Sequence, residues 1–204
     1  KGIWVAKKRY MLNVIDEEGV RLAEPKLKLM GIEAVKSSTP QVCRGKIKEA
    51  IKIIMSKEQS DLHKFIADFK QEFLTLKPEM IAFPRSCNNI KKYASNSSIF
   101  IKGTPIHVKG ALIYNHQLKN LNLGMKYPYI QDGDKIKFLK LKEANPFKFD
   151  VISYMSTLPT EFKLKEYVDY EIQFQKTFLD PMRFILDAIN WKAEPVASLE
   201  SFFG

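Results

Sequence analysis

The sequence predicts an α+β protein in which helices dominate, and three observations carry that prediction. Apolar residues recur at helical spacing in several segments, a few short segments alternate between polar and apolar residues, and prolines and glycines separate the two kinds. The chain has 204 residues, 45% of them hydrophobic, which suits one domain or two small lobes around a buried core. It contains no internal repeat, no low-complexity segment and no apolar run near the ~20 residues that cross a membrane.

The N-terminal segment is predicted to form a β-hairpin. Residues 10–22 contain a run of β-forming residues, a polar turn at 16–19 that ends in glycine, and the start of a return strand. Residues 26–29 alternate between lysine and leucine, so the chain is expected to remain extended as far as Lys36.

Two helices are predicted next. The segment 37–40 places hydroxyls before a proline, which indicates a capped helix start, and that helix would bury Ile47, Ile51 and Ile54. Ser56 and Gln59 have the spacing of a capping box and predict a second start. The second helix would end before Pro78, and its apolar stripe consists of Leu62, Phe65, Ile66, Phe69, Phe73 and Leu76.

The C-terminal half is predicted to mix strands and helices. A helix is expected after Pro105, a half-exposed strand over 135–142 and a short strand over 151–154. A long helix is expected from 161 to 179, and Asp180-Pro181 is expected to cap a last one.

The charge balance favours a polyanionic partner. Lysine and arginine number 33 against 23 acidic residues, a formal net charge of +10 that is spread along the chain. Nucleic acid is the first candidate partner, an anionic membrane surface is the second, and a basic domain with no such partner is the alternative. Cys43 and Cys87 have no paired spacing, which fits a reducing compartment and neither a disulfide scaffold nor a zinc site.

The sequence lacks the motifs of several common catalytic and cofactor sites. The sequence contains no GxxxxGK, GxGxxG or GxSxG pattern, and its three histidines are too scattered for a metal pair on one helix face. Two-metal chemistry needs carboxylates that can bridge ions ~4 Å apart, and Asp132-Gly133-Asp134 is the one pair at suggestive spacing. A glycine-containing turn is the better explanation for it, so no catalytic, metal or cofactor site is predicted in this chain.

One cationic motif and several polar patches are suited to nucleic acid. Lys7-Lys8-Arg9-Tyr10 offers cations for phosphates or groove-edge acceptors and a tyrosine beside them, although a solvated edge strand would look the same. Similar groups recur once per segment, which favours nucleic acid over ordinary surface: Lys36, Ser37, Ser86, Asn89, Lys91, Lys92, Tyr93, Lys102 and His107.

The run KKRYMLNVIDEEGVRLAEPKLKLMGIEAVKSSTP at 7–40 resembles the palm-to-thumb junction of the family B replicative DNA polymerases of T-even bacteriophages. Further matches follow in the same order over essentially the whole chain: NNIKKY at 88–93, HVKGALIYN at 107–115, GDKIKFL at 133–139, NPF at 145–147 and DYEIQFQKTFLDP at 169–181.

The resemblance implies a division into a junction hairpin at 1–24, a thumb domain at 25–194 and a C-terminal peptide at 195–204. It implies that Lys7, Lys8, Arg9 and Tyr10 touch the primer-template duplex, with Lys8 and Tyr10 in the minor groove. Contacts to the phosphate backbone are implied for Lys36, Ser86, Lys91, Lys92, Tyr93, Lys102, His107 and Lys176.

The resemblance also implies what the chain lacks. The family's catalytic aspartates lie in palm motifs containing SLYPS and DTDS, neither of which occurs here, so this chain alone is expected to be inactive. Divalent metal ions are expected only in the palm. The expected partners are duplex DNA and the palm and fingers of the same polymerase, in the cytoplasm of an infected bacterium.

The C-terminal tail has an apolar face. Leu199, Phe202 and Phe203 have the spacing of one helical turn, and in this family a similar flexible peptide binds the sliding clamp. The alternative is that the tail packs on its own domain. The start at Lys1 suggests a fragment of a longer protein, while two other possibilities remain open: a separately encoded half of a split polymerase, and a basic module that binds protein or anionic lipid.

Overall fold

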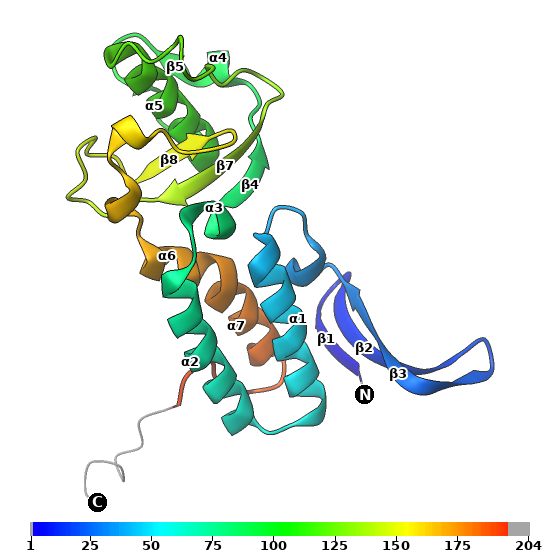
Figure 1. Ribbon diagram of the computed structural model, residues 1–204. Helices are drawn as coiled ribbons and strands as arrows, with labels where there is room; N and C mark the ends of the chain where they lie inside the picture. The colour runs from blue at the N-terminus through cyan, green and yellow to red at the C-terminus, as the bar shows by residue number, and fades with distance from the viewer. Residues whose placement is uncertain (1, 196–204) are drawn as a thin grey trace, which may run out of the picture. The chain divides into compact units, whose positions relative to one another are not determined.

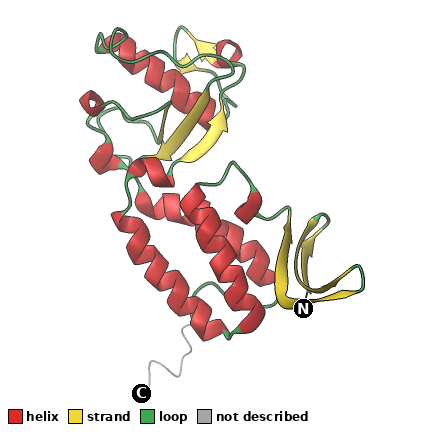
Figure 2. Cartoon of the chain, turned by 45° about the vertical axis from the view of Figure 1, so that its right-hand side comes forward, coloured by secondary structure: helices red, strands yellow, loops and turns green. Residues whose placement is uncertain are grey.

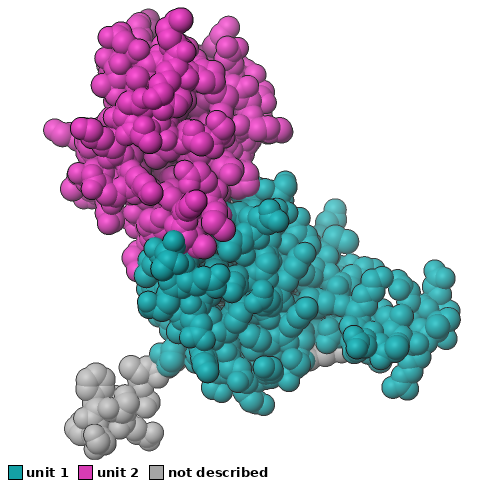
Figure 3. Space-filling view, viewed as in Figure 1, with its two compact units in different colours: residues 1–75, 174–204 teal, residues 76–173 magenta. Residues whose placement is uncertain are grey.

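The computed structural model of the chain describes residues 2–195. Its contacts divide those residues into two compact units, coloured separately in Figure 3. Unit 1 comprises residues 2–75 and 174–195, and unit 2 comprises residues 76–173. Unit 2 is therefore an insertion in the sequence of unit 1, and each unit is described by itself.

Unit 1 begins with a three-stranded antiparallel sheet, β1 (Gly2–Ala6), β2 (Arg9–Glu17) and β3 (Val20–Met30), in that order. The predicted hairpin turn is confirmed: an Asp16 carboxylate oxygen accepts the Gly19 N–H at 2.9 Å, and Gly19 has a φ of +82°. The return strand continues beyond the predicted Leu22 to Met30 and is followed by a 3₁₀ turn, η1 (Glu33–Val35).

The helical part of unit 1 consists of α1 (Gln41–Ser56), α2 (Gln59–Thr75) and a C-terminal run that ends in α7 (Asp180–Asp187) (Figure 1). The predicted faces of the first two helices lie in the core, with Ile47, Ile51 and Ile54 fully buried. Phe65 and Leu76 are only half-buried. An aromatic cluster joins α2 to the C-terminal run, with ring centroids 4.8–5.8 Å apart: Phe69, Phe73, Phe174 and Phe178.

The predicted caps of these two helices are wrong. Helix α1 follows Pro40 without a side-chain cap, and Thr39 is buried instead. Ser56 is still inside α1, where its hydroxyl donates to the Lys52 carbonyl at 2.8 Å and is not available to α2. The start of α2 is held by Asp61, whose carboxylate accepts the Glu58 N–H at 3.2 Å.

The long helix predicted over 161–179 is also wrong. Two separate 3₁₀ turns, η2 (Thr160–Phe162) and η3 (Lys165–Tyr167), occupy its first part, and Lys163 between them has a φ of +50°. Phe162 and Leu164 are buried in unit 2, so tertiary burial overrides the local helical preference.

The helix begins only at α6 (Tyr170–Phe174) and passes through a five-residue π-helical turn, η4 (Gln175–Leu179), directly into α7. The Asp180-Pro181 pair therefore does not start a separate helix, because Leu179 before it already has helical dihedrals. Helix α7 buries Met182, Ile185 and Leu186, whereas Ile189, which has the same spacing, lies beyond the end of the helix and is half-buried.

Unit 2 contains a three-stranded antiparallel sheet in the order β4 (Phe83–Ser86), β7 (Lys135–Lys140) and β8 (Val151–Tyr154), and helix α5 (Ile106–Asn120) packs on β8 (Figures 1 and 2). Both predicted strands and the helix after Pro105 are confirmed, although β7 ends at Lys140 and buries three of its six residues. The smaller elements are α3 (Pro78–Ile81), α4 (Ile90–Tyr93) and the paired strands β5 (Ala94–Ser95) and β6 (Ile99–Phe100).

The predicted class, α+β with helices dominant, is confirmed (Figure 2). Within residues 2–195, none of the helices combines the length and the apolar character that a membrane crossing requires.

Candidate nucleic-acid interface

The motif Lys7-Lys8-Arg9-Tyr10 forms the tight turn between β1 and β2. Ala6 pairs with Arg9 across the two strands, so Lys7 and Lys8 are the two residues of the turn itself. Lys8 has a φ of +62°, and both lysine side chains are exposed. The sequence thus places two neighbouring cations at the tip of a short hairpin, where they can reach an anionic surface.

Arg9 has a different environment from the two lysines. Its Nη2 donates to Glu33 Oε2 at 2.7 Å, and its guanidinium lies 5.4 Å from the centroid of the Phe184 ring on α7. The Arg9 side chain is only 24% exposed. It therefore connects the turn to η1 and to α7 rather than extending into solvent.

Glu33 also joins two of the predicted patches. Its second carboxylate oxygen accepts from Lys36 Nζ at 2.8 Å, so one carboxylate holds the turn and the segment that carries Lys36 and Ser37. Lys36 and Ser37 are exposed. The first two predicted patches are therefore close together in unit 1.

Tyr10 lies next to an exposed tryptophan that sequence reasoning missed. Trp4 pairs with Tyr10 across β1 and β2, their ring centroids are 6.1 Å apart, and Trp4 is 66% exposed. Tyr10 also pairs with Met30 on β3. This aromatic pair, of which Trp4 is exposed and Tyr10 half-buried, could have been found from the strand register, which places both residues on one face of the sheet.

In unit 2, the predicted patch at 86–93 is fixed by an acidic side chain from another segment. Asp132 Oδ1 accepts the Ile90 N–H at 2.6 Å at the start of α4. Asn89 before it has a φ of +60°, and Lys91 and Lys92 are exposed on the helix. Lys92 Nζ lies 5.6 Å from the centroid of the Tyr93 ring.

Ser86 has a cationic neighbour that the sequence patterns did not select. Lys135 pairs with Ser86 across β7 and β4, and its Nζ donates to the Ser86 hydroxyl at 2.7 Å. Lys135 is exposed, so the pair adds a cation beside the hydroxyl. The register of β4 and β7, which needs the fold, is the signal that links the two residues.

Arg85 and His107 both lie near the ring of Phe138. The Arg85 guanidinium is 5.6 Å from the Phe83 ring centroid and 5.7 Å from that of Phe138, and the His107 ring is 6.5 Å from Phe138. Partial burial lowers the pKa of Arg85, and burial together with the charge of Arg85 lowers the pKa of His107. The lowered pKa favours the neutral imidazole of His107, which can form a hydrogen bond but carries no charge.

Two further predicted cations, Lys102 and Lys176, lie in different units. Lys102 is exposed between β6 and α5, and Lys176 in the π turn of unit 1 pairs with Asp180 at 2.9 Å.

Asp150 in unit 2 binds two lysines, Lys109 at 2.7 Å and Lys140 at 2.8 Å. Burial would raise the pKa of Asp150, but these hydrogen bonds outweigh it and hold the pKa at about 2. The predicted clamp-binding residues Leu199, Phe202 and Phe203 lie outside the described residues.

Both carboxylates of Asp132-Gly133-Asp134 accept hydrogen bonds from backbone N–H groups. Besides the bond from Asp132 to Ile90, Asp134 Oδ2 accepts the Gln131 N–H at 2.7 Å, and Gly133 has a φ of +90°. The interpretation of this segment as a turn is confirmed. Among residues 2–195, no group of three histidine, cysteine or acidic side chains is arranged to hold a metal ion.

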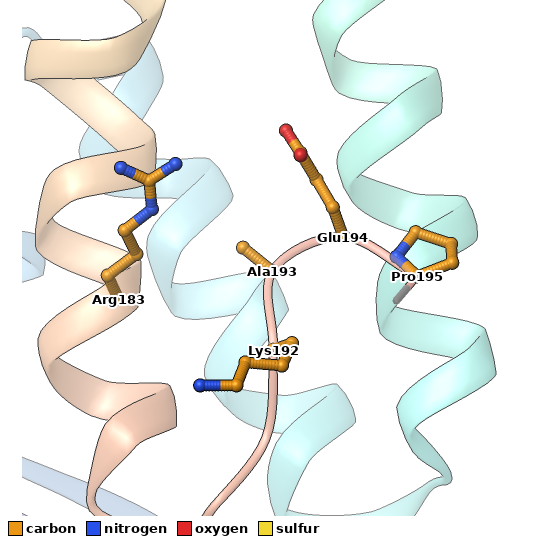
Figure 4. Close-up of a pocket in the computed structure, with 5 residues that line it drawn as sticks. All are labelled: Arg183, Lys192, Ala193, Glu194 and Pro195. Atoms are coloured by element: carbon orange, nitrogen blue, oxygen red, sulfur yellow. The ribbon is translucent and has the colours of Figure 1, made fainter. Parts of the chain in front are cut away.

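A small hollow of about 260 Å³ occurs in unit 1 where the described chain ends (Figure 4). Arg183 on α7 lines it together with the segment 192–195. The Lys192 carbonyl in that segment contacts His63 Nε2 at 2.9 Å. The lining offers one guanidinium, one ammonium and one carboxylate but no nucleophile, so the hollow does not suggest an active site.

The chain belongs to the class of basic α+β proteins and exposes cations at its turns, and comparison with known proteins shows what it is similar to. In an alignment of 207 residues that covers the whole chain, it is 34% identical to the DNA-directed DNA polymerase of Enterobacteria phage T4. It is 36% identical over 206 residues, 99% of its length, to the DNA-directed DNA polymerase of Escherichia phage RB69. The resemblance to T-even phage polymerases is thereby confirmed.

The matches cover only part of each relative. In both cases the aligned region is 22% of the relative, so the chain spans about a fifth of the length of the curated relatives that it matches. No protein-family model matches the chain.

Proposed function

We propose that this chain is the thumb region of a family B DNA-directed DNA polymerase and that it holds the primer-template duplex. The observation that carries the proposal is the similarity of the chain, over 99% or more of its own length, to part of two phage DNA polymerases. The exposed Lys7-Lys8 turn beside Tyr10 supports it. In this proposal Lys8 and Tyr10 reach minor-groove acceptors, which every base pair offers, so the duplex is held without reading its sequence.

Phosphate contacts come from both units in this proposal. In unit 1 these contacts are assigned to Lys7, Lys36 and Ser37. In unit 2 they are assigned to exposed or half-buried polar side chains: Ser86, Asn89, Lys91, Lys92, Tyr93, Lys102 and Lys135. His107 contributes as a neutral hydrogen-bonding group, because its pKa is lowered. Lys176 is a further phosphate contact, although it would have to exchange its pairing with Asp180.

Duplex binding with a steep salt dependence is the test. The affinity of the 204-residue chain for two duplexes of unrelated sequence should be equal, and log Kd should rise by ~0.9 per log salt for each phosphate contacted. A double variant, Lys7→Gln with Lys8→Gln, should bind more weakly and lower the salt slope by about one, because Lys7 is the one of the two that is assigned to a phosphate. Absence of duplex binding even at low salt would overturn the proposal.

A matched control separates position from charge. Lys52→Gln with Lys57→Gln removes two exposed lysines of the helix α1 region and leaves the same net charge of +8, that is +10 minus 2. If the proposal is right, this pair should weaken binding far less than the pair at the turn. Equal losses would mean that only bulk charge attracts DNA.

Catalysis and processivity are also proposals for the parent polymerase. We infer that the chain does not extend primers alone, because the palm motifs with their metal-binding aspartates are not in it, and that its tail at Leu199, Phe202 and Phe203 binds the sliding clamp. A palm-containing half of such a polymerase should regain primer extension when the chain is added if the two form a split enzyme. Co-sedimentation with anionic liposomes stronger than duplex binding would favour the membrane-surface alternative.

A further inference from the structure

We propose that Arg9 is not a DNA ligand but a positioning residue, and that Gly31 and Glu33 form a seat that fixes the Lys7–Tyr10 turn for duplex binding. The inference rests on the proposed function and deepens it. It divides the four residues of the motif Lys7–Tyr10 into those that touch DNA and one that holds the others in place.

Gly31 allows the backbone of the turn to approach closely. It follows β3 with a φ of +64°, and a Cβ built on it would lie 2.3 Å from the carbonyl oxygen of Lys8 and 3.1 Å from Cγ of Arg9. Real Cβ atoms essentially never come that close to another atom. The position therefore requires glycine twice, for its dihedral angle and for the space that the Lys8 peptide occupies.

Glu33 fixes the turn from the side. Its carboxylate is bound at one oxygen by Arg9 at 2.7 Å and at the other by Lys36 at 2.8 Å, and its side chain is only 19% exposed. A charge-assisted bond to a forked guanidinium constrains orientation as well as distance. The same carboxylate thus sets the turn relative to the segment of Lys36.

Phe184 completes the environment of Arg9. The guanidinium lies over this ring at 5.4 Å, and Arg9 Nε is buried without a hydrogen-bond partner among the described residues. Arg9 is therefore bound by η1 on one side and covered by α7 on another. A guanidinium in that position has only part of its surface left for a phosphate, since its side chain is 24% exposed.

The sign of one substitution distinguishes positioning from bulk electrostatics. Glu33 is an acidic residue between cations that are proposed to bind DNA, so its charge alone opposes the duplex. Glu33→Gln raises the net charge from +10 to +11, because one negative charge is removed, and on electrostatics alone it would tighten binding. If Glu33 positions Lys7, Lys8 and Tyr10, the same change weakens binding.

The experiment measures Kd and its salt dependence for the 204-residue chain and a duplex of defined sequence. Glu33→Gln should raise Kd by about fivefold, because the bonds from Arg9 and Lys36 lose the negative charge that strengthens them. The salt slope should also fall, by about one to two, as the lysines leave their register with the phosphates. A loss of folded protein would instead reduce the active fraction and leave the slope unchanged.

The control is an acidic residue of the same sheet with no role in the seat. Glu17 pairs with Lys26 at 3.5 Å and is 58% exposed, so Glu17→Gln makes the same charge change at the far end of β2. It should leave Kd unchanged or lower it slightly. The melting temperature of both variants shows whether folding is affected.

Two further variants keep the inference testable if Glu33→Gln folds poorly. Gly31→Ala leaves the charge unchanged and should still weaken binding and lower the slope. Arg9→Lys keeps the cation but not the fork, and it should weaken binding as Glu33→Gln does, whereas a simple phosphate ligand would tolerate it. The inference is overturned if Glu33→Gln or Arg9→Lys binds as tightly as the parent chain; if the parent chain binds no duplex, the proposed function fails first and the inference with it.

Discussion

Gly110 of helix α5 lies directly against Ser153 of strand β8. A Cβ on Gly110 would be 2.5 Å from the Ser153 hydroxyl oxygen and 2.8 Å from its backbone nitrogen. The hydroxyl is itself fixed, because it donates to the carbonyl of His107 one helical turn earlier at 2.8 Å. This approach of α5 to β8 therefore depends on the absence of one methyl group.

The first prediction uses this contact and a second helical glycine as its opposite. Gly110→Ala should destabilise the chain by about 1–2 kcal/mol, because overpacking outweighs the gain of about 1 kcal/mol in helix propensity. Gly45 in α1 is exposed with no atom within 4 Å of such a Cβ, so Gly45→Ala should stabilise. Urea unfolding followed by far-UV circular dichroism gives both signs, and a shared sign would contradict the packing argument.

Much of the fold could be predicted because local signals and tertiary packing agree. The turn at 16–19, the apolar face of α2 and the helix after Pro105 all follow from side-chain chemistry that acts within a few residues. The prediction over 161–179 failed because Phe162 and Leu164 are buried in unit 2, with Lys163 between them in a left-handed conformation. Helical spacing of apolar residues does not reveal that burial in the fold will override the local helical preference.

The candidate site was predictable in its exposed cations but not in its supports. Lys7 and Lys8 were recognised as neighbouring charges, and the structure exposes both. The bond from Arg9 to Glu33 joins residues 24 positions apart, and Lys135 meets Ser86 through strand register 49 positions apart. Neither relation has a sequence pattern, because it depends on how separate strands and turns pack.

The second prediction concerns the support of the patch at 88–93. Asp132→Ala removes the acceptor of the Ile90 N–H and should destabilise this segment by about 0.5–2 kcal/mol, as the loss of a helix cap does. Cys87 is a suitable probe because its backbone pairs with both Gly133 and Asp134. Burial and then the charges of Asp132 and Asp134 raise the pKa of its thiol to about 11, so it should react slowly in the parent chain.

The measurement is alkylation of Cys87 at pH 8, followed by mass spectrometry. Cys87 should react faster in Asp132→Ala, while the buried Cys43 of unit 1 should keep its rate and serves as the internal reference. Asp132→Asn retains an acceptor oxygen and should lie between the two. The order should be the same in Mg²⁺ and in EDTA, since the carboxylate binds a backbone N–H; a difference would revive a metal-binding role.

The third prediction is a pH dependence that arises from His107. Its folded-state pKa is lowered by burial and by the charge of Arg85, so the unfolded chain binds a proton more readily. Stability should therefore be fully present above the unfolded-state pKa of about 6.5 and should fall as the pH decreases below that value. His107→Gln should lose this dependence between pH 7.5 and 5, whereas His116→Gln, at an exposed position, should retain it.

The fourth prediction uses Trp4 to locate the duplex. Trp4 is 66% exposed and lies 6.1 Å from the Tyr10 ring, while Trp191 is half-buried. In a Trp191→Phe chain, Trp4 is the sole tryptophan, and its fluorescence should change on duplex addition because binding at Lys8 and Tyr10 alters its solvent contact. The change should disappear at high salt, in parallel with binding measured by anisotropy of a labelled duplex. Binding by anisotropy without any change at Trp4 would place the duplex away from this turn, because no other part of the proposed interface contains a tryptophan.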